Sequence, residues 1–174
     1  MRHATLLLPL AIVVTLAGCT RHAAPPQLPG GAADASAREA AYAASALEHH
    51  ASFWRQAWKR ADGTYNIDGI RASVDAYPAS KAARKKARNR GVTVAILGAL
   101  GGGFVGYAAG QQLFVADDDR LADGTLYTLY GAGAAIALVA VVLDRTWART
   151  AYGEIAPAYN AELRRDLALP PLAR

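Results

Sequence analysis

The sequence predicts an all-α protein in which a small helical module is joined to an antiparallel hairpin of two apolar helices. Two observations predict the hairpin: residues 91–116 and 124–143 contain no charged side chain, and a short acidic turn, 117–123, separates them. A third observation, apolar residues at helical spacing over 36–61, predicts the module. With 174 residues, the chain has room for one modest domain with appendages.

The N-terminus has the features of a secretory signal peptide over residues 1–18. A short basic start is followed by an apolar stretch from Leu6 to Leu16, which is too short to span a bilayer comfortably. The stretch ends in Leu16-Ala17-Gly18-Cys19, and Cys19 is the only cysteine of the chain. An uncleaved N-terminal anchor with an incidental cysteine is the alternative interpretation.

This ending resembles the lipobox of bacterial lipoproteins. The resemblance implies that the signal peptide is removed, that Cys19 becomes the new N-terminus, and that its thiol carries a covalent lipid. No other cofactor is implied. In that family, a residue other than Asp after the cysteine favours the outer membrane, and Thr20 stands there.

Residues 19–35 are rich in Pro and Gly and predict a flexible tether that carries the lipid. Ser36 and Glu39 have the spacing of a capping box, which predicts a helix that begins there and ends near Asp62-Gly63. The stripe of this helix ends in two tryptophans, Trp54 and Trp58. Two interpretations stay open for them: packing against another helix, or contact with a membrane interface.

The rest of the region 36–90 predicts a short helix or irregular connection over 66–77, followed by a new helix with Pro78 in its first turn. Six positive charges and no negative one then directly precede the first uncharged segment. We interpret them as a contact for an anionic membrane surface rather than only a solvated face. They are Lys81, Arg84, Lys85, Lys86, Arg88 and Arg90.

Within the predicted hairpin, 91–143, four glycines recur at spacing four: Gly98, Gly102, Gly106 and Gly110. On a helix they form one strip without side chains, where another helix backbone can approach closely. A flexible glycine-rich loop is the alternative. The hairpin resembles the glycine-zipper double-span segment of small envelope lipoproteins, and the resemblance implies self-association.

The predicted topology places the bulk of the chain in the periplasm. In the inner membrane, the basic run before the hairpin would oppose the positive-inside bias, so the outer membrane is favoured. The hydrophobicity of residues 136–143 is the argument for the inner membrane. The C-terminal tail, 144–174, predicts a helix that docks Tyr152, Ile155, Tyr159 and Leu163 on the 36–61 helix.

No pattern predicts an enzyme, a metal site or a nucleic-acid contact. His49 and His50 are adjacent, which on a helix separates the two rings by about 100° and prevents joint chelation. The expected partners are membrane lipid, a second copy of the chain, and other envelope proteins. The resulting hypothesis is a non-enzymatic envelope lipoprotein with a structural or interaction role. An accessory subunit of a secretion, pilus or transport machine and a membrane-permeabilising protein are the alternatives.

Overall fold

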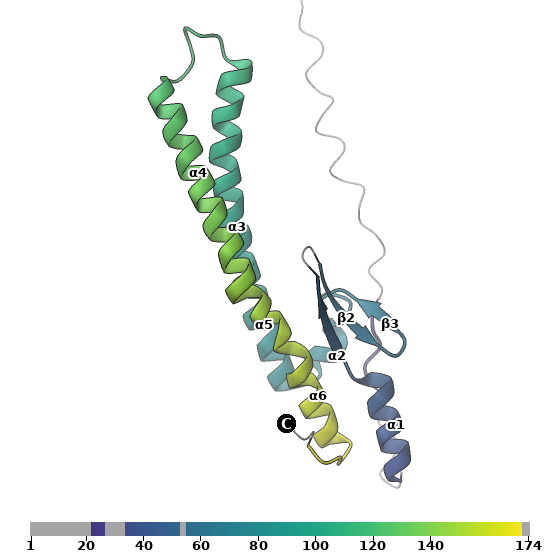
Figure 1. Ribbon diagram of the computed structural model, residues 1–174. Helices are drawn as coiled ribbons and strands as arrows, with labels where there is room; N and C mark the ends of the chain where they lie inside the picture. The colour runs from purple at the N-terminus through teal and green to yellow at the C-terminus, as the bar shows by residue number, and fades with distance from the viewer. Residues whose placement is uncertain (1–21, 27–33, 53–54, 172–174) are drawn as a thin grey trace, which may run out of the picture.

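The computed structural model describes residues 22–26, 34–52 and 55–171. A long hairpin of two helices projects from a small module that contains a three-stranded sheet (Figure 1). The chain is therefore mostly helical, as the sequence predicts, but it is not all-α. Cys19, the rest of the predicted lipobox and Trp54 lie outside the described residues.

The first helix, α1, spans Ala35–Ser45. Its N-cap is Asp34, whose Oδ1 accepts a hydrogen bond from the Ala37 amide at 2.7 Å. The predicted capping box at Ser36 and Glu39 is therefore wrong, because the cap lies two residues earlier. The Glu39 carboxylate instead accepts a hydrogen bond from Arg164 at 3.2 Å, which ties α1 to the C-terminal helix.

The predicted helix over 36–61 is also wrong beyond Ser45, because three antiparallel strands follow in the order β1-β2-β3. They are β1 (Glu48–Ala51), β2 (Gln56–Arg60) and β3 (Gly63–Tyr65). In β2, Trp58 and Arg60 are buried while Lys59 between them is exposed, which is the period of a strand. Gly63, with φ 151°, lies after the turn between β2 and β3, so Asp62-Gly63 marks a hairpin rather than a helix end.

The module core lies between the sheet and the C-terminal helix α6 (Ile155–Asp166). Within 66–77, where the sequence allows a short helix or an irregular connection, the chain forms the short helix α2 (Arg71–Asp75). Ile155, Tyr159 and Leu163 are buried, as predicted for the tail, but they join Leu47, Trp58, Ile70, Val74 and Tyr77 instead of a long 36–61 helix. The sheet has taken the place that the sequence assigned to that helix.

Helix α3 runs without interruption from Pro78 to Phe114, which is about 55 Å at 1.5 Å per residue. Pro78 lies in its first turn, as predicted. The Glu162 carboxylate from α6 accepts hydrogen bonds from the Ala79 and Ser80 amides at 3.0–3.1 Å and so caps this end. The predicted boundary at 90/91 is not a break in the chain: one helix belongs to both the module and the hairpin.

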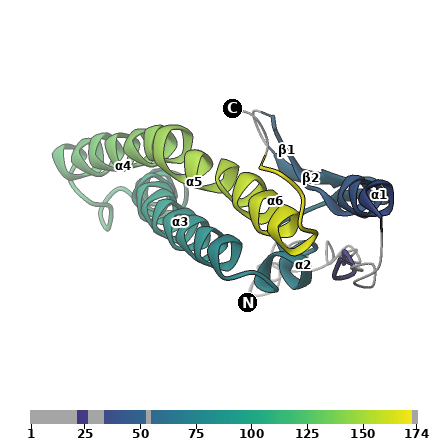
Figure 2. The ribbon, with the colours of Figure 1, turned by 90° about the horizontal axis from the view of Figure 1, so that it is seen from below.

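Helix α4 (Asp123–Leu143) returns antiparallel to α3, and the two lie side by side along their length (Figures 1 and 2). A π-helical segment, Asp144–Ala148, joins α4 to α5 (Arg149–Gly153), which leads into α6. The predicted antiparallel helical hairpin is thus present, and both its arms continue into the module.

Candidate functional site

Small side chains form the contact face between the two arms of the hairpin. The buried residues of α3 in the hairpin are Gly101 and Ala108, those of α4 are Leu126, Gly133 and Ala140, and the two other buried residues of α3, Ser80 and Ala87, lie at its module end. Within each helix they are separated by seven residues or a multiple of seven. Seven residues make two turns, so these positions share one face, which is the repeat of two helices wound closely around each other.

The two backbones approach each other closely at Gly101 and Gly133. A Cβ placed on Gly101 would lie 2.7 Å from the Ala137 amide nitrogen and 2.8 Å from the Gly133 carbonyl oxygen. A Cβ on Gly133 would lie 2.8 Å from the Gly101 carbonyl oxygen. Both positions therefore need glycine, because the obstructing atoms are backbone and cannot rotate away.

The predicted glycine strip does not close the hairpin. A Cβ at Gly102, Gly106 or Gly110 would meet nothing within 4 Å, and one at Gly98 would only reach the Ala140 methyl at 4.0 Å. Three of the four glycines thus line an open surface rather than the α3–α4 contact. Sequence reasoning missed Gly101 and Gly133, although small residues spaced by seven were a signal that could have found them.

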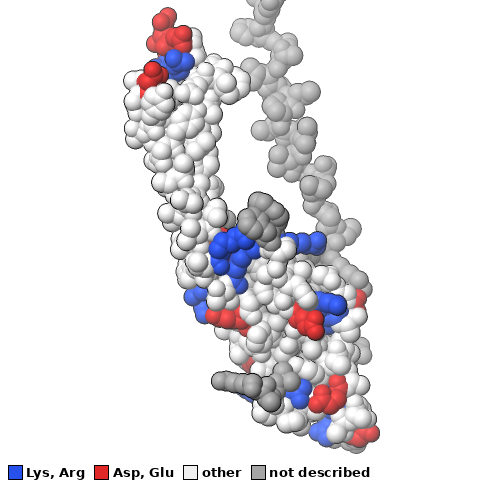
Figure 3. All heavy atoms as spheres, viewed as in Figure 1, with Lys and Arg blue, Asp and Glu red and all other residues white. Residues whose placement is uncertain are grey.

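The outer surface of the hairpin is apolar. Two helical segments, Pro78–Phe114 and Asp123–Asp166, are long and apolar enough to cross a membrane by length and composition. In Figure 3 the hairpin is white between a charged tip and the charged module. Its exposed large side chains are Val92, Ile96, Leu100, Phe104, Tyr107, Leu113, Phe114, Tyr127, Leu138, Val139, Val141 and Val142.

The six predicted surface cations have different surroundings. Lys81, Lys85 and Arg88 are exposed. Arg84 donates to Asp75 at 2.8 Å through two nitrogens, and Lys86 pairs with Glu154 at 2.7 Å. Half of the run therefore joins α3 to neighbouring parts of the chain, since Arg90 also contacts Trp147. At 1.5 Å per residue, Lys81 lies about 15 Å before Gly91 along α3, so only Arg88 and Arg90 lie next to the apolar segment.

At the hairpin base, which we define as residues 88–91 and 143–149, aromatic and cationic groups meet. The Arg90 guanidinium carbon lies 4.9 Å from the centre of the Trp147 ring, and Arg90 donates to the Trp147 carbonyl oxygen at 3.0 Å. Trp147 remains 36% exposed, whereas the next residue, Ala148, is fully buried. A tryptophan stacked on an arginine beside an apolar span is typical of a membrane–water interface.

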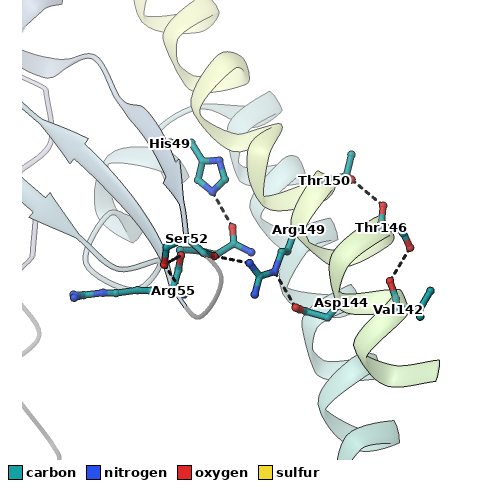
Figure 4. A network of polar contacts seen from close by, with 9 residues as sticks. His49, Ser52, Arg55, Val142, Asp144, Thr146, Arg149 and Thr150 are labelled. Carbon is teal, nitrogen blue, oxygen red and sulfur yellow. Dashed lines mark hydrogen bonds and ion pairs between the residues drawn. The ribbon is translucent and has the colours of Figure 1, made fainter. Parts of the chain in front are cut away.

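Arg149 links the hairpin base to the sheet, as Figure 4 shows. Its Nε donates to Asp144 Oδ2 at 2.9 Å, and its Nη1 donates to the Ser52 carbonyl oxygen at 2.6 Å. Ser52 and Arg55 close the turn between β1 and β2, with the Ser52 amide donating to the Arg55 carbonyl at 2.8 Å. Ser52, the residue after β1, is therefore held beside Asp144, the first charged residue after the apolar arm α4.

The segment His22–Pro26, predicted to belong to a flexible tether, is docked on the module. Ala23 is buried and its amide donates to the Gly69 carbonyl at 2.7 Å. The Ala24 carbonyl accepts from Arg60 at 2.6 Å and from the Ser73 hydroxyl at 3.0 Å. Arg60 is in turn paired with Asp62, and this hydrogen bond lowers the pKa of the Asp62 carboxyl to about 2.

In the described part of the chain, no group of three or more His, Cys, Asp or Glu side chains is placed to hold a metal ion. His49 and His50 lie on β1, not on a helix, and the His49 ring faces Gln56 at 2.8 Å and the buried Trp58. The chain matches no protein-family model, no curated protein and no solved structure.

Proposed function

We propose that the chain is a non-enzymatic envelope lipoprotein, anchored in the outer membrane by the lipid on Cys19 and by the α3–α4 hairpin, with its module in the periplasm. Its role is structural: it presents the module at the membrane surface for interaction with a second copy or with other envelope proteins.

The observation that carries this proposal is the distribution of polarity along the hairpin. An uncharged, outward-facing apolar surface separates the acidic turn, with Asp117 at its start, from the Arg90–Trp147 pair at the base. The uncharged part of α3, residues 91–114, measures about 36 Å, which exceeds the roughly 30 Å of a bilayer core. In water, such a surface would be a large aggregation liability.

Self-association is part of the proposal and concerns the open glycine strip. Since nothing lies within 4 Å of a Cβ at Gly102, Gly106 or Gly110, these glycines leave a strip without side chains on the outside of α3. In a bilayer, helices associate through close packing at such small residues, because apolarity alone does not drive them together. The partner that fits is the same helix of a second copy.

Thiol labelling in whole cells tests the anchoring, since an acylated Cys19 leaves any introduced cysteine as the single free thiol. A membrane-impermeant maleimide should label Asp118→Cys in intact cells and Ala40→Cys on α1 only after the outer membrane is permeabilised. Leu100→Cys, on the exposed apolar face, should stay unlabelled in both conditions. Labelling of Leu100→Cys would exclude the spanning hairpin, and labelling of Asp118→Cys only after lysis would move the hairpin to the inner membrane.

Replacement of Cys19 tests the lipid anchor separately. Cys19→Ser should abolish incorporation of labelled fatty acid and leave an uncleaved precursor, because both processing steps need the thiol. Thr20→Ser, one residue away, is the control and should be processed normally. A mature-sized, lipid-labelled Cys19→Ser protein would refute the lipoprotein assignment.

A further inference from the structure

We propose that the open edge of β1 and the cleft beside it bind an extended, acidic segment of another periplasmic protein, which joins the sheet as a fourth strand. The inference deepens the proposed function by naming the kind of partner that the module binds. It rests on that function, because a module held in the periplasm by the hairpin is what brings such a partner within reach.

The strand β1 runs antiparallel beside the helices α5 and α6, and contacts at its two ends fix this alignment. At one end, the Asn160 side chain of α6 holds Leu47 through two hydrogen bonds of 2.8–2.9 Å. At the other end, Arg149 of α5 donates to the Ser52 carbonyl at 2.6 Å. Since β1 has a neighbouring strand, β2, on one side only, its other edge is the outer edge of the sheet.

This outer edge presents backbone groups that point away from the sheet. The Ser52 amide donates to the Arg55 carbonyl at 2.8 Å, which makes these two residues a hydrogen-bonded pair of the antiparallel ladder. Because such pairs alternate along a ladder, the backbone groups of Leu47 and His49 point away from β2. Asn160 occupies those of Leu47, whereas those of His49 have no partner among the described residues. A peptide group placed next to Asn160 would satisfy them.

A cleft of about 960 Å³ lies beside this edge, and both Leu47 and His49 line it. That volume is within the range of ligand sites in proteins. The helices present small side chains to it, Gly153, Ala156 and Ala161, so that larger side chains do not fill the space next to the strand. Figure 4 shows the His49 side chain directed from β1 toward these helices. An open strand edge with a side-chain pocket beside it is the arrangement by which proteins bind extended peptides.

The charge of the cleft favours an acidic partner. Its charged lining residues are Arg164 and Arg165, and no Asp or Glu is among the described residues that form it. The Arg164 guanidinium is buried and already engaged, by Glu39 at 3.2 Å and by the Pro170 carbonyl at 2.6 Å. Arg165 is exposed, and its guanidinium has no partner in the described part of the chain. A carboxylate that enters the cleft would therefore pair with Arg165.

A second copy of the chain does not fit this edge while both hairpins lie in one membrane. Copies in one membrane are related by rotation about the membrane normal, and β1 runs beside the helices that continue the apolar arm α4. Such a rotation places the two β1 edges parallel and at equal height, so that donors face donors and acceptors face acceptors. The fourth strand is therefore supplied by a different protein.

Fluorescence anisotropy tests the strand edge with the full mature protein in detergent micelles. The probe is a labelled heptapeptide of alternating threonine and valine whose central residue is glutamate, so that the valines and the glutamate share one face when it is extended. In an antiparallel ladder, a residue hydrogen-bonded to His49 has its side chain on the same face as His49, toward the cleft. N-methylation of the valine and glutamate amides should therefore abolish binding, whereas N-methylation of the threonine amides, which point away, should leave binding unchanged.

Charge changes in the protein and the peptide test the carboxylate separately. An exposed ion pair is worth a factor of up to about five in an equilibrium constant, and charge reversal replaces this attraction by repulsion. Arg165→Glu should therefore raise the dissociation constant of the glutamate peptide roughly tenfold. It should leave the affinity for a peptide with central glutamine unchanged. Lys85→Glu, at an exposed position on α3 outside the cleft, is the control and should bind like the unaltered chain.

Several outcomes would overturn the proposal. They are the absence of saturable binding, equal effects of the two N-methylation patterns, and equal effects of Arg165→Glu and Lys85→Glu. Binding that occurs only after the chain is shortened to end at Pro171 would also overturn it, since the protein's own last residues would then occupy the cleft. The measurement uses micelles, so a failure here leaves the thiol-labelling result for the hairpin intact, and a refuted hairpin does not alter peptide binding.

Discussion

The close contact of Gly101 with α4 allows a stringent test of the hairpin packing by a single methyl group. Gly101→Ala places a Cβ 2.7 Å from the Ala137 nitrogen, which is 0.7 Å short of the 3.4 Å at which ordinary contact begins. Gly102→Ala adds the same methyl group one residue further along the same helix, where nothing lies within 4 Å. The two variants therefore differ in packing while sharing the chemical change.

The difference in stability between these variants follows from the geometry. Both gain about 1 kcal/mol from replacing a helical glycine by alanine. Only Gly101→Ala must also push two backbones apart, and overpacking of this kind costs about 1–3 kcal/mol. Because the propensity gain is common to both, Gly101→Ala should be about 1–3 kcal/mol less stable than Gly102→Ala. For a chain of this size, that corresponds to a melting temperature lower by roughly 2–12 °C.

The measurement is thermal unfolding of the purified protein in detergent micelles, followed by the loss of helical circular dichroism. Gly133→Ala should resemble Gly101→Ala, since its Cβ would meet the Gly101 carbonyl oxygen at 2.8 Å. Equal melting temperatures for the position 101 and position 102 variants would refute the packing of the two arms through Gly101. A higher melting temperature for Gly101→Ala would do so even more directly.

Three further outcomes are expected. Gly106→Leu should weaken chemically crosslinked oligomers, whereas Gly103→Leu, off the glycine strip but equally open, should not; equal effects would remove the strip from the interface. The pKa of Asp62 is lowered in the folded protein to about 2 from 3.8, so its pairing with Arg60 stabilises the fold above pH 4 and is lost as the pH falls from about 4 to 2; Asp62→Asn should flatten the acid limb of the stability curve, and an unchanged limb would contradict this. Glu162→Gln should cost about 0.3–1 kcal/mol in denaturant unfolding, because a carboxylate at the N-terminus of α3 becomes neutral, and an unaltered midpoint would count against that cap.

The hairpin could be predicted from the sequence because one property, the absence of charge, extends over two whole helices. An apolar run of that length has few stable alternatives to a helix, and the acidic turn between the runs marks where the chain reverses. Which face of α3 packs against α4 could not be predicted in the same way. Four glycines at spacing four attract attention, but which face of a helix meets its partner depends on both helices, and Gly133 opposite Gly101 decides it here.

The sheet could not be predicted because its strands are short and because their many polar residues obscure the alternation of apolar and polar side chains that is typical of a strand. β1 reads Glu48-His49-His50-Ala51, which has no apolar face of its own, and its stability comes from pairing with β2. A contact that is remote in sequence holds the residue just before β1: the Asn160 side chain pairs with both the amide and the carbonyl of Leu47. A local pattern cannot indicate a contact of that kind.

The sequence predicts the basic run, 81–90, as one contact surface for anions, but two of its six cations form ion pairs within the protein instead. Charge counting alone groups all six residues, but the structure pairs Arg84 with Asp75 and Lys86 with Glu154. Asp75 lies nine residues before Arg84, on α2, whereas Glu154 lies 68 residues after Lys86, at the junction of α5 and α6. Conversely, Ser52 contacts Arg149 at the hairpin base in a region that folds as a sheet rather than as the expected helix.

The π-helical segment shifts which positions are buried along the long helical segment that α4, α5 and α6 form. In α4 the buried positions advance by seven, from Leu126 to Gly133 to Ala140, and the next would be Trp147. The π turn holds one additional residue, so Ala148 takes the buried place and the following step of seven reaches Ile155. Deleting one residue here would rotate everything downstream by about 100°, bringing Trp147 inward and turning Ile155 and the rest of α6 away from the core. A single extra residue thus lets the same helical segment bury one set of positions in the hairpin and a set shifted by one residue in the module.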